Sequence, residues 1–96
     1  MNWNEYKEYV KQNDPLGKEL IEEAETEAAI ISAMISQRTS LGLSQRDLAA
    51  LCNIPQSSIA RIETNRITPR LDTLLHILNQ LGLTLTVTAN ASYADR

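Results

Sequence analysis

The chain has 96 residues, of which 43% are hydrophobic and 22% charged, so we expect one folded domain and exclude a disordered chain. It has no apolar run long enough to span a bilayer, no signal-peptide pattern and a single cysteine, which together predict a cytoplasmic protein. The net charge of −3 is unevenly placed, because residues 1–36 carry eight acids and three lysines, whereas residues 37–96 carry six arginines and four acids. This division suggests two surfaces with different partners, although Glu-rich helices can also be simply solvated.

Helical periodicity governs the first 40 residues. Trp3, Tyr6 and Val10 fall on one face of a short helix, and Asp14-Pro15 then ends it and caps the next. Apolar residues recur at helical spacing over 16–40, which predicts one long helix or two helices with a break near Glu25-Thr26.

Two short helices with a tight turn follow. Ser44 and Asp47 form a capping-box pattern at the start of a helix over 45–52, and Asn53 suits a left-handed turn before a helix over 55–63. Such a pair is a helix-turn-helix unit. The apolar residues expected between the two helices are Leu48, Ala49, Ile59 and Ile62.

The C-terminal part changes character after a helix expected over 69–81. Leu83–Thr88 alternates apolar and polar residues, the period of a β-strand. A lone strand leaves backbone groups unpaired, so we predict that it pairs with the same strand of a second copy through Leu83, Leu85 and Val87. An extended tail packed on its own domain is the alternative.

The stretches "LSQRDLA", "SSIARIE" and "TPRLDTLLHILNQLG" resemble the lambda-repressor-like (Xre) helix-turn-helix family over about residues 30–81. The resemblance implies an all-α, lambda-repressor-like bundle, to which we add an N-terminal helical extension and the short C-terminal β-strand for dimerisation. It also implies repression of transcription by a homodimer bound to an inverted-repeat operator in double-stranded DNA.

The resemblance also implies which residues touch DNA. Gln45 matches a residue that contacts phosphate and braces the second motif helix, and Gln56 matches a base-reading position suited to adenine. Arg38 and Glu63 match a structural salt bridge. The predicted DNA contacts are Gln45, Gln56, Ser57, Ser58, Arg61, Arg66, Thr68 and Arg70.

The whole layout is similar to that of HigA-type antitoxins of bacterial toxin–antitoxin systems, with a "DP" break, an acidic stretch over 19–27 and an "LGLxLxV" tail. This likeness implies an antitoxin that binds and neutralises a small basic ribonuclease toxin and autoregulates its operon. A stand-alone Xre-type or phage-derived repressor, or an adaptor that never reads DNA, remains an alternative. The predicted toxin contacts are Trp3, Tyr6, Tyr9, Glu22 and Glu23, although Trp3 and Tyr6 could instead cover the protein's own core.

We divide the chain into an N-terminal extension over 1–29, a DNA-binding domain over 30–82 and a dimerisation strand and tail over 83–96. No acid–base pair, nucleophile or metal-ligand spacing is present, so we expect no enzyme activity, metal, cofactor or membrane association. Cys52 is expected to pack as a small hydrophobic residue, and His76 to have a packing or surface position rather than a catalytic role.

Overall fold

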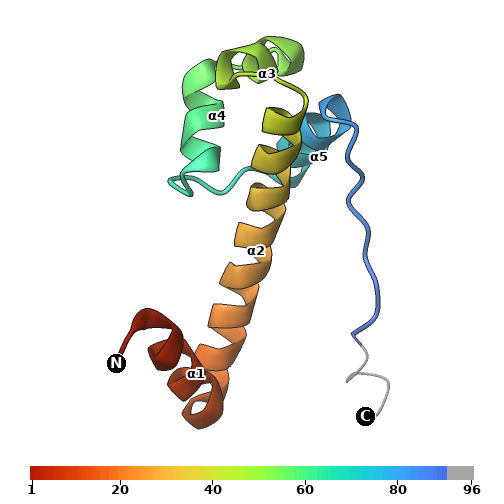
Figure 1. The fold of residues 1–96 in the computed structure, drawn as a ribbon. Coiled ribbons are helices and arrows are strands. Elements are labelled where there is room, and N and C mark those ends of the chain that lie inside the picture. The colour runs from red at the N-terminus through yellow and green to blue at the C-terminus, as the bar shows by residue number, and fades with distance from the viewer. Residues whose placement is uncertain (91–96) are drawn as a thin grey trace.

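The computed structural model describes residues 1–90, which form five α-helices (Figure 1). Helix α2 is a long rod that carries α1 against its N-terminal half, while the three shorter helices gather around its C-terminal end. The helices are α1 (Trp3–Asn13), α2 (Pro15–Ser40), α3 (Gln45–Cys52), α4 (Gln56–Glu63) and α5 (Leu71–Gln80).

Side-chain caps explain where the first two helices begin. The Asn2 side chain accepts a hydrogen bond of 2.8 Å from the Glu5 backbone N–H, and Asp14 accepts one of 3.1 Å from Gly17 N–H. Pro15 stands in the first turn of α2, where its missing N–H costs nothing. Helix α2 continues unbroken for 26 residues, about 39 Å, so of the two alternatives left open by the sequence the single long helix is the one that forms.

The predicted capping box opens α3. Ser44 Oγ accepts from the Asp47 N–H at 2.9 Å, and the Asp47 carboxylate accepts from the Ser44 N–H at 2.9 Å. This bond to the Ser44 backbone holds the pKa of Asp47 below its usual value. Asn53 follows with φ of 56°, as predicted, and α4 begins at Gln56.

The core lies entirely around the C-terminal third of α2 and the three helices that follow. The predicted contacts between α3 and α4 are confirmed, since Leu48 and Ile59 are fully buried and Ala49 and Ile62 nearly so. Burial raises the pKa of the Cys52 thiol, and the carbonyl of Cys52 lies 3.1 Å from Nε2 of His76. The buried residues are Ile31, Met34, Leu48, Ala49, Cys52, Ile59, Ile62, Ile77, Leu78 and Leu81.

Helices α1 and α2 form an N-terminal hairpin, residues 3–28, that has no buried residue. Lys11 Nζ lies 2.6 Å from a carboxylate oxygen of Glu25, and this contact lowers the pKa of Glu25 and raises that of Lys11. The rings of Trp3 and Tyr6 stack at 5.8 Å, yet 66% of Trp3 and 49% of Tyr6 remain exposed. The interpretation that these two aromatics cover the protein's own core is therefore wrong.

The hairpin turn depends on a glycine. A Cβ atom built on Gly17 would lie 2.6 Å from Cγ1 of Val10 and 2.8 Å from Oδ2 of Asp14. Real Cβ atoms essentially never approach other heavy atoms so closely. The absence of a side chain at this position lets α1 pack closely on α2.

The predicted β-strand over Leu83–Thr88 is wrong. Residues 83–90 are without regular secondary structure, and no strand occurs in the part of the chain that the structure describes. The reason is that a strand needs an extended neighbour to pair with, and residues 1–82 are helices and short turns. Leu83 packs on the core, Leu85 is 37% exposed and Val87 is 95% exposed, while the rest of the predicted tail, residues 91–96, lies outside the described residues.

Among residues 1–90, no helix combines the length and the apolar character needed to cross a membrane.

Candidate nucleic-acid interface

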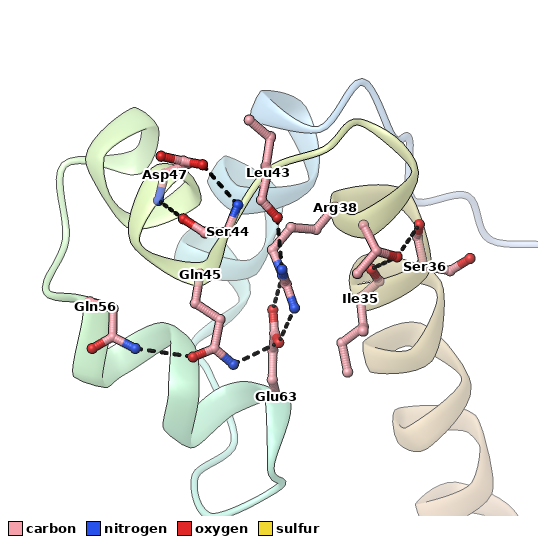
Figure 2. Close-up of polar contacts among 10 residues, drawn as sticks. Ile35, Ser36, Arg38, Leu43, Ser44, Gln45, Asp47, Gln56 and Glu63 are labelled. Atoms are coloured by element: carbon pink, nitrogen blue, oxygen red, sulfur yellow. Dashed lines mark hydrogen bonds and ion pairs between the residues drawn. The ribbon is translucent and has the colours of Figure 1, made fainter.

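Four side chains form a continuous hydrogen-bonded row, called here the polar chain: Arg38, Glu63, Gln45 and Gln56 (Figure 2). Arg38 donates from Nε and Nη2 to the two carboxylate oxygens of Glu63, at 2.7 and 2.9 Å. Gln45 Nε2 donates to Glu63 at 3.0 Å, and Gln56 Nε2 donates to Gln45 Oε1 at 3.0 Å. The polar chain thus joins the end of α2 to both helices of the motif.

The polar chain runs from the interior to the surface. Only 12% of the Arg38 side chain and 5% of the Glu63 side chain are exposed, whereas Gln56 is exposed at the start of α4. Arg38 is also anchored by Nη1, which donates to the Leu43 carbonyl at 2.8 Å. The salt bridge predicted between Arg38 and Glu63 is confirmed, and it is bidentate.

The polar chain fixes which way each amide points. The Glu63 carboxylate can only accept, so Gln45 must turn its Nε2 toward it and its Oε1 toward Gln56. Gln56 in turn donates one N–H to Gln45, which leaves its Oε1 and its second N–H available to another partner. One acceptor beside one donor is the pattern that complements the N6 and N7 edge of adenine.

The other predicted DNA contacts lie on α4 and on the loop that follows it. Ser57 and Arg61 are exposed and Ser58 is half-buried, while Arg66 and Thr68 are exposed in the loop over 64–70. Arg70 is also exposed, with its Nε 3.3 Å from the carboxylate of Asp72, an ion pair that a phosphate would have to replace.

Sequence reasoning missed two features of this surface. Arg46 is exposed directly after Gln45 at the start of α3, and no salt bridge engages it within the described residues. The bond from Gln45 to Glu63, across 18 positions, was also not predicted. The excess of arginine in residues 37–96 was the available signal for Arg46, whereas spacing alone gives no signal for a bond between two side chains on different helices.

The predicted toxin contacts lie far from this surface, at the opposite end of α2 (Figure 1). Trp3 and Tyr9 are mostly exposed on α1, and Glu22 and Glu23 are exposed on α2. Within residues 1–90, no group of three or more His, Cys, Asp or Glu side chains is placed to hold a metal ion.

Known proteins are similar to this chain in sequence and in three-dimensional structure. The sequence model of the helix-turn-helix family matches residues 34–87. A protein of Haemophilus influenzae described as an "Uncharacterized HTH-type transcriptional regulator" is 38% identical over 86 residues, which cover 90% of this chain and 83% of that protein. A solved structure described as "Toxin-Antitoxin module from Streptococcus pneumoniae" superposes with a TM-score of 0.69 at 36% identity and covers 94% of both chains. The chain therefore belongs to the helix-turn-helix family of DNA-binding transcriptional regulators.

Proposed function

We propose that this regulator is a repressor that reads an inverted-repeat operator by placing α4 in the major groove of each half-site. The observation that carries the proposal is the polar chain, which ends in an exposed Gln56 whose amide is already oriented to pair with adenine. Arg61 is exposed on the same helix and reaches a guanine or a phosphate, and Arg66, Thr68 and Arg70 serve as phosphate contacts.

Operator binding by single variants tests this reading. Gln56→Ala should cost roughly 1–3 kcal/mol of binding and abolish the preference for adenine at one position of each half-site. Arg61→Ala should weaken binding while leaving the circular dichroism spectrum unchanged. Gln80→Ala, which removes an exposed glutamine from the end of α5, is the matched control. Unchanged operator affinity in both Gln56→Ala and Arg61→Ala would mean that α4 does not read DNA.

The repressor acts as a homodimer, with the half-sites about one DNA turn, or ~34 Å, apart. Leu85 and Val87 support this proposal, because they leave apolar surface exposed just after Leu83 has packed on the core. The double variant Leu85→Ser/Val87→Ser should be monomeric in light scattering and bind the operator more weakly. A variant that still dimerises would show that the two copies meet elsewhere.

The regulator further acts as an antitoxin that binds and neutralises a small basic ribonuclease toxin. Support comes from the Streptococcus pneumoniae structure, which is described as a toxin–antitoxin module, and from the N-terminal hairpin of this chain. Trp3, Tyr6 and Tyr9 expose aromatic surface that no core residue covers, and Glu22 and Glu23 are exposed on α2. Exposed aromatic rings anchor interfaces, and acidic side chains steer a basic partner.

Co-expression with the product of the neighbouring gene tests the antitoxin role. We expect a stoichiometric complex with a small basic protein that cleaves RNA when released. Trp3→Ala and Tyr9→Ala should weaken the complex, whereas Leu41→Ala, an exposed apolar residue after α2, should not. A homodimer that purifies with nothing attached would favour the stand-alone repressor instead.

A further inference from the structure

One concave site lies apart from the hairpin aromatics and borders the surface proposed for DNA, with which it shares Thr68. It is a pocket of about 70 Å³ between α2 and the loop over 64–70 that joins α4 to α5. Its apolar lining comes from Ile30 and Ile31 of α2, Ile67 and Pro69 of the loop, and Leu74 of α5. The polar side chains that line it are Glu27, Asn65 and Thr68. We call it the loop pocket.

The size of the loop pocket decides the kind of occupant. Sites for small molecules and cofactors usually enclose about 300–1,000 Å³. A volume of 70 Å³ is well below that range and has room for only a few water-sized groups. The pocket therefore fits one apolar side chain of a protein partner.

The charge around the loop pocket decides the character of that partner. Glu27 also lines a second concave surface along α2, together with Glu19 and Glu23. These three glutamates lie four residues apart, on one face of the helix, and no salt bridge engages them within residues 1–90. A partner segment that follows α2 into the pocket must therefore be basic.

We propose that the loop pocket is a docking site for a basic segment of the protein partner, which inserts one apolar side chain between Ile30 and Ile67 while its basic residues face Glu19, Glu23 and Glu27. The proposal rests on the partner-binding function inferred above and extends the contact surface along α2 beyond Trp3, Tyr6 and Tyr9. The loop over 64–70 thereby touches the partner through Ile67, next to the predicted phosphate contact Arg66.

The test uses the full-length protein and the product of the neighbouring gene. Ile67→Ser should weaken the complex on the order of tenfold or more, because it replaces an apolar side chain of the pocket lining with a small polar one. Ile67→Leu should restore most of the affinity. Leu71→Ser is the matched control, since Leu71 is 64% exposed and does not line the pocket. Glu27→Lys should slow association, and the effect should shrink at high salt.

The outcomes separate this inference from the antitoxin role. Weakening by Ile67→Ser but not by Leu71→Ser, with unchanged circular dichroism, supports the docking site. A complex of unchanged affinity in both Ile67→Ser and Glu27→Lys overturns the docking site and leaves the antitoxin role intact. Absence of any complex with the unmodified protein overturns the antitoxin role, and the docking site with it.

Discussion

Removal of Glu63 tests whether the polar chain stabilises the fold. Its carboxylate accepts three hydrogen bonds, two from Arg38 and one from Gln45, with only 5% of its side chain exposed. Glu63→Ala leaves the Arg38 guanidinium, 12% exposed, with the Leu43 carbonyl as its remaining partner. Loss of one member of a buried ion pair costs about 3–5 kcal/mol, and because Leu43 still accepts one bond we expect about 3 kcal/mol.

Urea denaturation followed by circular dichroism measures that loss. Asp72→Ala is the control, because its pair with Arg70 is exposed and should contribute less than about 1 kcal/mol. The double variant Arg38→Met/Glu63→Leu should recover much of the stability, since no buried charge is left without a partner. A cost for Glu63→Ala no larger than that for Asp72→Ala would refute the view that the bridge is a buried, coupled element.

The same variant carries a consequence for DNA. Without Glu63, the Gln45 amide is free to rotate, and it no longer holds the Gln56 amide in one orientation. Glu63→Ala should therefore reduce the discrimination between adenine and other bases at the Gln56 position more than it reduces total affinity. Operator titrations with one base exchanged measure this, and an unchanged discrimination ratio would contradict the positioning role.

Three further changes address the hairpin and the core. Gly17→Ala should open the hairpin, seen as a shift in tryptophan fluorescence. Val10→Ala in addition should restore it in part, because it removes the clashing methyl group while the contact with Oδ2 of Asp14 stays tight. Acidification should open the hairpin too, because the pair with Lys11 lowers the pKa of the Glu25 carboxyl. The stability that this pair contributes is present above the usual carboxyl pKa and is lost as the pH falls through the lowered pKa. Glu25→Gln should therefore flatten the fluorescence transition with pH. Met34→Ala, at a fully buried site, should cost about 2–5 kcal/mol in urea denaturation, and a cost below about 1 kcal/mol would mean that the core collapses into the space.

Local signals predicted the helix-turn-helix unit well. The capping box at Ser44 and the left-handed Asn53 act within a few residues of chain, so sequence spacing alone locates them. The Arg38–Glu63 bridge came from a family resemblance and is confirmed. The hydrogen bond from Gln45 to Glu63 depends on how α3 and α4 cross, and no local sequence pattern determines that crossing.

The C-terminal segment illustrates the limit of periodicity. Alternation over 83–88 describes which side chains are apolar, whereas a strand is defined by hydrogen bonds to another segment. Residues 1–82 offer no extended neighbour, so the alternation does not become a strand. The packing of Leu83 and the exposure of Val87 likewise depend on where α5 ends relative to the core.

The unbroken α2 makes the relation between the two ends of the molecule a matter of helical phase. Each residue added near the exposed Ala29, just after the hairpin and before the core begins at Ile31, would turn the N-terminal hairpin by about 100° around the helix axis and move it about 1.5 Å further from α4. Related chains can thus keep the same helix-turn-helix unit and the same hairpin, yet present the hairpin on a different side of α4 through one insertion or deletion. The number of residues in α2 therefore sets the direction in which the hairpin points around the helix axis relative to the helix-turn-helix unit.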